Sequence, residues 1–424
     1  MKLAVLSDFH LGYERFQEDA YRQAERAMLL ACERADALLI PGDIFDSKTP
    51  RPEVFAQAFS LFRIPLEREL GARVASFSAR DGRQNICRAP VVAIHGTHEI
   101  RAKGLVNPVQ MLEAAGFVVN AQSATVVLEK EAEHVAVFGL GGVPERQARD
   151  ALEVLSPRPI PGAFNILMFH QSLSELIPAL GEECLSVEDL PRGFDLYVNG
   201  HIHLRHAKKY GERMLLIPGS TVVTQLREGE VEGKGIYIYD TRTREYEFVE
   251  LGSRPFEFVR LEFSDAGLED IYARCRQAVA DAIAKHGGAN PVVRLKVSGT
   301  LKRGFTAADL DFSAVEKEFE GRAYVTIDKR ITSEELKERI EQIRALRERS
   351  VSVRELGMGL LRDKLKASGF SLEVDLELLF ELLSSPKRSA PEEVLRVLLH
   401  TRPFTNLEYS TSFAMALAAA LGEA

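Results

Sequence analysis

Residues 3–10 read LAVLSDFH, a run of four apolar residues that leads into serine, aspartate and histidine. Short apolar runs followed by polar or metal-ligating residues return at ALLIPGD (37–43), VVAIHGTHE (91–99), ILMFH (166–170), LYVNGHIH (196–203) and LLIPGS (215–220). Continuous runs of this length are typical of strands buried on both faces. Helical patterns at 18–35 and 53–70 separate several of them. This alternation predicts a layered α/β domain that extends to about residue 252, with ligands bound at the strand ends.

A different pattern begins near residue 254 and predicts a small, separate α+β domain. Its expected elements are a strand at 256–263, a helix at 268–285, a strand at 292–299, a helix at 312–319 and a strand at 323–328. After residue 331 the chain is predicted to be helical, with capping-box spacing at Thr332 and Glu335. The same spacing returns at Ser352 and Glu355. The expected helices are 334–349, 352–369, 372–383 and 391–399. We therefore expect three parts, with bounds of 1–252, 253–330 and 331–424.

The composition is that of an ordinary globular protein, with 46% hydrophobic and 27% charged residues in 424. The four cysteines are far apart and form no CxxC, which argues against a disulfide framework or a cysteine zinc site. The apolar run at the start is too short for a signal peptide, and the uncharged stretch 410–422 is too short to span a membrane. No P-loop, Rossmann fingerprint or serine elbow suggests another chemistry. We expect a soluble, cytoplasmic protein.

Charge is distributed unevenly along a chain whose formal net charge is −8. Residues 73–103 hold six basic residues against two acidic ones, and residues 204–213 hold four against one. Both stretches flank the polar strand ends, so they are candidates for contact with a polyanion such as nucleic acid. The candidate side chains are Arg83, Arg88, Arg101, Lys103 and Arg205. Taken alone, such stretches are also explained by solvated loops.

Histidine is scarce, with 10 residues in the chain, yet seven histidines lie at or beside the predicted strand ends. They are His10, His95, His98, His170, His201, His203 and His206. A two-residue spacing, as in Asp8 and His10, lets both side chains bind one ion just past the end of a strand. Imidazole and carboxylate without thiolate suit Mn, Fe or Zn with mixed N and O ligands. A carboxylate that bridges two such ions, about 3.5–4 Å apart, would favour phosphoester hydrolysis.

The motifs at the strand ends resemble, in chain order, those of the calcineurin-like metallophosphoesterases. They are DFH (8–10), GDIFD (42–46), GTHE (96–99), FHQ (169–171) and GHIH (200–203). The resemblance implies a layered αββα sandwich with two divalent metal ions. Within the superfamily, the sequence resembles the nuclease subunit of the SbcCD-type double-strand-break-repair complex. The matching segments are HLGY (10–13), GHIHLR (200–205), PGST (218–221) and GKGIYIYD (233–240). That family also has a small capping domain and C-terminal helices that bind an ABC-type coiled-coil ATPase, so the resemblance covers essentially the whole chain.

The resemblance implies a role for each matching residue. It implies one metal ion held by Asp8, His10, Asp43 and His203, and a second held by Asp43, His170 and His201. His98 would contact the scissile phosphate and protonate the leaving oxygen, with Glu99 to orient it. The family usually has asparagine, a ligand of the second metal, where this chain has Thr97. A hydroxyl is a poorer neutral ligand than a carboxamide oxygen, so we expect weaker binding at the second site. His95 is either a substitute ligand or a packed strand residue.

The leading hypothesis is a metal-dependent DNA exonuclease and endonuclease that processes ends in double-strand-break repair, with Mn as the expected metal. The resemblance implies double- and single-stranded DNA, the ATPase and a second copy of the chain as partners, and no membrane. One alternative is a phosphomonoesterase on the same metal site, because the motifs define the chemistry and not the substrate. Another is an architectural DNA-end-binding subunit whose nuclease has decayed at Thr97. The basic stretches favour a polyanion, and the six other implied ligands argue against decay.

Overall fold

The computed structural model describes residues 1–177, 183–333 and 353–367, together with isolated positions between 337 and 381. The chain falls into two compact units. The first comprises residues 1–262, 269–298 and 311–330, and the second comprises 263–268, 299–310 and the described residues from 331 onward. The first unit continues past residue 252, and the expected boundaries after 252 and 330 stay predictions. None of the described helices is both long enough and apolar enough to cross a membrane.

Two sheets form the part of the chain that carries the polar strand ends. The first contains β1 (Lys2–Val5), β2 (Ala37–Ile40), β4 (Val91–Ala93), β5 (Val119–Asn120), β12 (Gly235–Asp240) and β13 (Tyr246–Glu250), in the order β13-β12-β1-β2-β4-β5. The second contains β3 (Arg73–Ala79), β6 (Ala124–Lys130), β7 (Glu133–Leu140), β8 (Phe164–Phe169), β9 (Leu196–Asn199), β10 (His206–Tyr210) and β11 (Arg213–Ile217), in the order β10-β11-β9-β8-β7-β6-β3. In the first sheet β1, β2 and β4 are parallel, and in the second β7, β8 and β9 are parallel.

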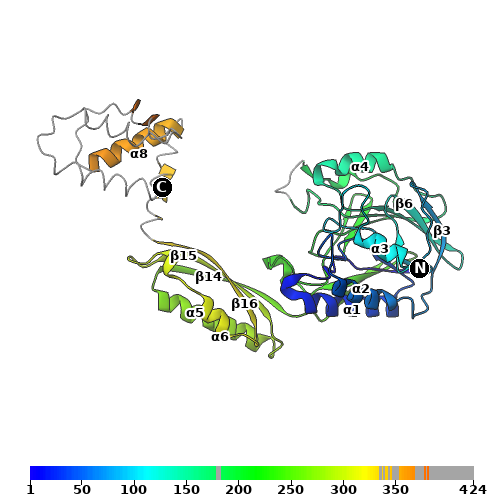
Figure 1. Cartoon of the computed structure of the whole chain (residues 1–424), viewed down its shortest axis with the longest axis horizontal. Coiled ribbons are helices and arrows are strands. Elements are labelled where there is room, and N and C mark those ends of the chain that lie inside the picture. The colour runs from blue at the N-terminus through cyan, green and yellow to red at the C-terminus, as the bar shows by residue number, and fades with distance from the viewer. Residues whose placement is uncertain are drawn as a thin grey trace, which may run out of the picture. The chain divides into compact units, whose positions relative to one another are not determined.

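Alternate side chains of the second sheet pack into two different cores. Val135 and Val137 of β7 belong to the larger core, which also contains residues of the first sheet. Ala136 and Phe138 of the same strand face the other way, toward a core that includes α4 (Ala148–Leu155). This alternation follows from the two-residue period of a strand. The helices α1 (Gln17–Arg34), α2 (Pro52–Arg63) and α3 (Pro108–Ala114) complete the fold, with α4 on the opposite side from α1 and α2 (Figure 1). The predicted layered α/β fold is confirmed.

Helix α2 is shorter than the pattern predicted. Pro52 opens it, because a proline in the first turn removes no intrahelical hydrogen bond. The helix ends at Arg63 and not at residue 70, so the prediction of a helix over 53–70 is wrong at its end. Pro65 is the physical reason, since it has no N–H to donate and its ring clashes with the carbonyl of the preceding turn.

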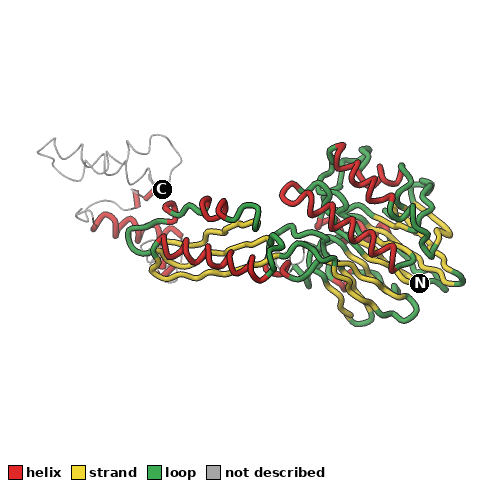
Figure 2. Tube along the Cα trace, turned by 90° about the horizontal axis from the view of Figure 1, so that it is seen from below, coloured by secondary structure: helices red, strands yellow, loops and turns green. Residues whose placement is uncertain are grey.

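The α+β part begins at β14 (Phe256–Ala266) and also contains α5 (Leu268–Lys285), β15 (Val292–Leu301), α6 (Ser313–Glu318) and β16 (Tyr324–Ser333). Each of these elements was predicted within a few residues of its bounds. The strands form one sheet in the order β14-β15-β16, and both helices lie on one of its faces (Figures 1 and 2). Because β16 runs to Ser333, Thr332 lies in a strand, and its predicted role as a helix cap is wrong.

The helical region after residue 333 is described in part. Helix α8 (Val353–Ala367) lies within the helix expected at 352–369. A side chain at Gly357 would collide with the ring of Phe380, and Arg354 pairs with Glu381 at 3.1 Å. Helix α8 therefore packs against the segment around residue 380. The helix expected at 391–399, most of the helix at 372–383 and the predicted cap at Ser352 lie outside the described residues.

Candidate metal centre

The predicted site residues come from the carboxyl ends of strands in both sheets. Asp8 and His10 follow β1, Asp43 follows β2, Thr97 and His98 follow β4, His170 follows β8, and His201 and His203 follow β9. Parallel strands end at the same edge of a sheet, so side chains just past those ends meet there. The structure brings all eight residues together. The predicted ligands fall into two groups, one with Asp8, His10 and His203, the other with Asp43, His170 and His201.

The first group is built around two histidine rings and a buried carboxylate. The Nε2 atoms of His10 and His203 lie 3.1 Å apart, and His203 Nε2 lies 3.8 Å from Asp8 Oδ1. The second carboxylate oxygen, Asp8 Oδ2, is buried and has no hydrogen-bond partner among the described residues. A buried polar atom without a partner calls for an ion or a water. Facing ring nitrogens beside such an oxygen fit a divalent cation with mixed N and O ligands.

The second group is centred on Asp43. Its Oδ2 atom lies 3.1 Å from His170 Nε2 and 3.5 Å from Thr97 Oγ1. Thr97 Oγ1 also lies 3.4 Å from His201 Nδ1, so the hydroxyl occupies a position among the other predicted ligands. The other oxygen, Asp43 Oδ1, accepts a hydrogen bond from the backbone N–H of His98 at 2.9 Å. His95 belongs to neither group of potential ligands.

Backbone strain is concentrated at the predicted ligands. The φ angles of Asp8, His10, Asp43 and His201 are 53°, 47°, 47° and 67°, in the left-handed region that residues other than glycine seldom adopt. Backbone hydrogen bonds hold two of these turns together, from Asp8 N to Gly42 O and from His10 N to Asp43 O, each 3.1 Å long. Strained conformations persist where the surrounding structure imposes them, and they cluster at functional sites.

The electrostatics of the groups suit a cation. Burial, reinforced by the nearby Asp43, raises the pKa of Asp8. Burial also opposes ionisation of Asp43, but the charge and the hydrogen bond of His170 outweigh it and lower the pKa of Asp43. In turn Asp43 raises the pKa of His170 to about 9 in spite of burial. Burial lowers the pKa of His201 to about 4 and that of His203 well below its usual value, so both rings are neutral and able to coordinate.

His98 lies beside the first group, and its side chain is 43% exposed. Its ring packs edge-on against His10 with centroids 4.9 Å apart. His98 Nδ1 lies 3.0 Å from the carbonyl oxygen of Asp46 and 3.6 Å from the carboxylate of the same residue. Asp46 Oδ1 also lies 3.0 Å from His10 Nδ1. Asp46 therefore contacts both histidines, a position that sequence reasoning missed although GDIFD (42–46) contains it.

Glu99 does not orient the His98 ring, so that expectation is wrong. Its carboxylate is buried and accepts hydrogen bonds from Phe45 N at 2.9 Å and from Gly96 N at 2.7 Å. Burial, together with the charge of Asp43, raises the pKa of Glu99 to about 8. The side chain therefore turns inward, where both of its oxygens accept hydrogen bonds from the backbone. Glu99 thus ties the loop after β4 to the loop after β2.

Behind His203 lies a buried polar network that sequence reasoning also missed. His203 Nδ1 pairs with Thr224 Oγ1, and the backbone N–H of Thr224 donates to Glu230 Oε1 at 3.1 Å. Lys234 Nζ donates to Glu230 Oε1 at 3.0 Å, to Ser220 Oγ at 3.0 Å and to the carbonyl oxygen of His203 at 3.1 Å. Lys234 lies in the quoted motif GKGIYIYD (233–240), but a lone lysine there gives no signal of burial.

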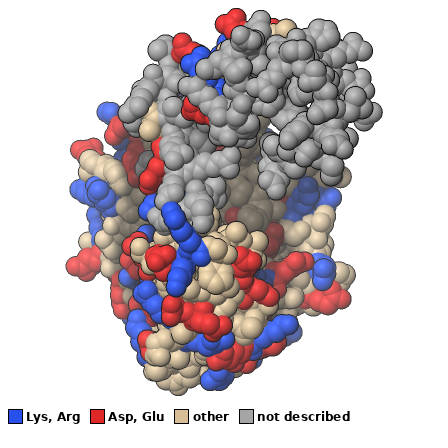
Figure 3. Space-filling model, turned by 90° about the vertical axis from the view of Figure 1, so that its left-hand side faces the viewer, with Lys and Arg blue, Asp and Glu red and all other residues tan. Residues whose placement is uncertain are grey.

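The five side chains predicted to bind nucleic acid differ in their exposure to solvent. Arg83 and Arg205 are half-buried and already bonded within the protein. Arg83 binds Asp81, Glu113 and the carbonyls of Asn120 and Gln122. Arg205 pairs with Glu232 and lies over the ring of Phe248. Arg88 and Lys103 are exposed, and Arg101 donates to the carbonyl of residue 106 at 3.4 Å. On the face drawn in Figure 3, basic and acidic side chains of the described residues are interspersed.

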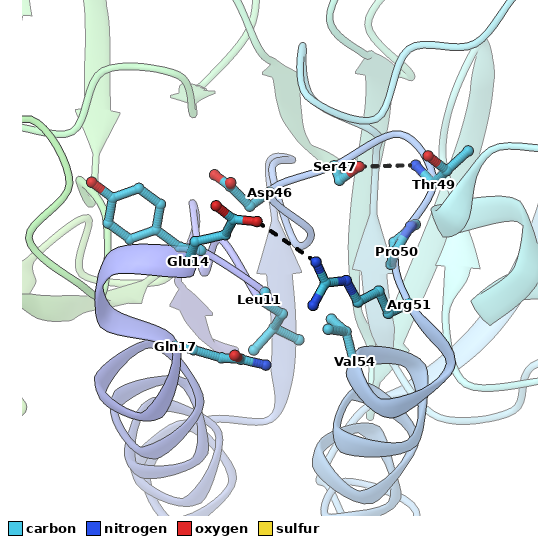
Figure 4. Close-up of a pocket in the computed structure, with 11 residues that line it drawn as sticks. Leu11, Glu14, Gln17, Asp46, Ser47, Thr49, Pro50, Arg51 and Val54 are labelled. Atoms are coloured by element: carbon cyan, nitrogen blue, oxygen red, sulfur yellow. Dashed lines mark hydrogen bonds and ion pairs between the residues drawn. The ribbon is translucent and has the colours of Figure 1, made fainter.

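A pocket of about 380 Å³ opens beside Asp46. Across it, Glu14 and Arg51 form an ion pair with 3.8 Å between Oε1 and Nη2, and both side chains are mostly exposed (Figure 4). Leu11 and Val54 contribute apolar surface to its lining. Asp46 therefore lines this pocket and also contacts His10 and His98.

Comparison with known proteins agrees with this geometry. Residues 1–205 match the family model described as calcineurin-like phosphoesterase. Double-strand break repair protein MRE11 of Encephalitozoon cuniculi is 33% identical over 261 residues, which cover 56% of this chain and 45% of that protein. The corresponding protein of Arabidopsis thaliana is 23% identical (77% of this chain, 51% of that protein), and DNA double-strand break repair protein Mre11 of Sulfolobus acidocaldarius is 26% identical (71% and 76%). The chain spans about half the length of the first two relatives.

Proposed function

We propose that this chain is a metal-dependent DNA nuclease. It carries a calcineurin-like metallophosphoesterase domain and is a homologue of double-strand break repair proteins of eukaryotes and archaea. It would act as exonuclease and endonuclease on DNA ends during double-strand-break repair. The observation that carries this proposal is the convergence of two Asp and His groups around Asp8 and Asp43, with the exposed ring of His98 beside them. The domain implies divalent metal ions, and we propose Mn as the metal.

Each group would hold one ion. The first would be bound by Asp8, His10, Asp43 and His203, and the second by Asp43, His170, His201 and Thr97. Bound divalent ions polarise a phosphoryl oxygen and lower the pKa of an attacking water. When the His98 ring is protonated, its Nδ1–H donates to the Asp46 carbonyl, and its Nε2–H is available to the leaving oxygen. Arg88, Arg101 and Lys103 are the proposed phosphate contacts, since Arg83 and Arg205 are bonded within the protein.

The function is tested by incubating the purified full chain, with and without Mn, with end-labelled duplex DNA, single-stranded DNA and a generic phosphatase substrate. We expect Mn-dependent release of labelled nucleotides from DNA. Hydrolysis of the phosphatase substrate alone would favour the phosphomonoesterase alternative. Binding of DNA ends without cleavage would favour the architectural alternative.

Replacing Thr97 with asparagine should strengthen binding at the second metal site. The carboxamide oxygen of asparagine is a better neutral ligand than the hydroxyl, which now lies 3.4 Å from His201 Nδ1 and 3.5 Å from Asp43 Oδ2. Wild-type activity should rise steeply with added Mn, and Thr97→Asn should lower the Mn concentration for half-maximal activity by about tenfold, equivalent to about 1.4 kcal/mol. Thr97→Val, of similar shape but without the oxygen, should raise it. Identical Mn dependence in all three proteins would refute the prediction.

The ATPase partner is proposed to bind the helices after residue 352. A chain truncated after residue 349 should keep Mn-dependent nuclease activity and fail to co-purify with the ATPase. The sequence of this region has apolar residues at helical spacing, a pattern used in helical recognition of a partner. If the truncated chain still bound the ATPase, the docking site would lie elsewhere.

We also propose that the chain forms a homodimer, which light scattering of the purified protein would test.

A further inference from the structure

Glu145 lies next to the second group of ligands and has no part in the ligand sets given above. It follows β7, in the short 3-10 helix Glu145–Gln147, and its Oε1 atom lies 3.6 Å from His201 Nε2. On the other edge of the same ring, His201 Nδ1 lies 3.4 Å from Thr97 Oγ1, among the predicted ligands. The His201 ring therefore directs one nitrogen to the metal group and the other to Glu145.

Neighbouring groups hold Glu145 in this position. The hydroxyl of Ser172, itself buried, donates to Glu145 Oε1 at 2.6 Å. The other oxygen, Glu145 Oε2, is buried, and no residue that the structure describes forms a hydrogen bond with it. The loop that leads to Glu145 is also fixed, because Gly142 N donates to His95 O at 2.9 Å and a side chain at Gly142 would collide with the backbone of Gly96. A carboxylate is thus held beside His201, with one oxygen bonded to Ser172 and the other left for a cation or a water.

We propose that Glu145 positions His201 for the second metal ion, an inference that rests on the proposed function. A histidine can coordinate through one ring nitrogen while the other carries the proton, and the acceptor of that proton selects the tautomer. The Glu145 carboxylate, 3.6 Å from Nε2, favours the tautomer in which Nε2 carries the hydrogen, so that Nδ1 presents its lone pair to the ion. Its negative charge also stabilises the cation, at a site where Thr97 offers only a neutral hydroxyl. Glu145 is a positioning residue that acts through His201.

The test is a titration of the full-length protein with Mn²⁺ alone, by calorimetry and by counting bound Mn per chain. Glu145→Gln should keep the first Mn at wild-type affinity and weaken the second by about 10–100-fold, the usual effect of losing a partner behind a ligand. The electron paramagnetic resonance signal of an exchange-coupled Mn pair should weaken in parallel. Ser172→Ala, which removes the donor that holds the carboxylate, should shift the second site in the same direction. Glu153→Gln is the matched control, at an exposed position of α4.

Wild-type affinity for both ions in Glu145→Gln would overturn the inference. Equal weakening of both ions, or unfolding at a lower temperature without a selective loss of the second ion, would also overturn it, because either result indicates a structural role. DNA cleavage is measured separately on the same samples. If the wild-type protein binds two Mn ions but cleaves no DNA, while Glu145→Gln loses the second ion, the nuclease proposal fails and the role of Glu145 is supported.

Discussion

Replacing His98 with alanine should lower the rate of DNA hydrolysis by about 10²–10⁴-fold, the typical contribution of one positioned proton donor. Metal and DNA binding should change little. The ring of His98 is 43% exposed and belongs to neither proposed ligand set. Its structural contact with Asp43 is made by the backbone N–H, which alanine retains. The measurement is single-turnover cleavage of end-labelled duplex at saturating Mn, with bound Mn counted in the same preparation.

His134→Ala is the matched control for this experiment, because His134 is an exposed histidine of β7. It should cleave DNA at the wild-type rate. A His98→Ala protein that cleaves nearly normally would show that the ring only packs against His10. A protein that has lost its metal ions would show instead that His98 contributes to the ligand structure. Either outcome would reject the assignment of His98 as the proton donor.

The strands that position the site could be predicted because each is a continuous apolar run in the interior of a parallel sheet. β1, β2, β8 and β9 are buried along almost all of their length, which leaves a strong signal in sequence. β3 gave no such signal. It lies at the edge of the seven-stranded sheet, and none of its seven side chains is fully buried. Its sequence therefore has no apolar run, and its basic residue Arg73 is compatible with a solvated loop.

The predicted site residues converge because the ends of parallel strands meet at one edge, a rule that needs only strand order. Their partners follow no such rule. Asp46 reaches the histidines from a loop and Glu145 from a short 3-10 helix, and their positions depend on tertiary contacts such as the close approach of Gly142 to Gly96. The orientation of Glu99 could not be predicted either. Two backbone N–H groups set the direction of its side chain, and its sequence neighbour His98 does not. Side-chain type and spacing predict which residues gather, and packing decides how each one is oriented.

Replacing Lys234 with methionine should destabilise the protein by about 3–5 kcal/mol, the usual cost of removing one partner of a buried ion pair. The Lys234 and Glu230 side chains are 5% and 2% exposed. Without Lys234 the carboxylate of Glu230 would stay buried, bonded to the backbone N–H groups of residues 224 and 225 but with no cation beside it. The carbonyl oxygen of His203 would also lose one of its donors and keep the backbone N–H of Ser220 at 3.3 Å. Urea unfolding followed by circular dichroism measures the change in the free energy of unfolding.

Arg22→Met provides the matched control for the loss of Lys234. Arg22 and Glu18 have the same four-residue spacing and lie 2.6 Å apart, but their side chains are 72% and 74% exposed. An exposed pair of this kind contributes only about 0.3–0.5 kcal/mol, because water and salt screen it. The double substitution Glu230→Gln with Lys234→Met should recover part of the loss, since no buried charge then remains unpaired. Equal unfolding midpoints for Lys234→Met and Arg22→Met would show that burial adds nothing to the interaction of Lys234 with Glu230.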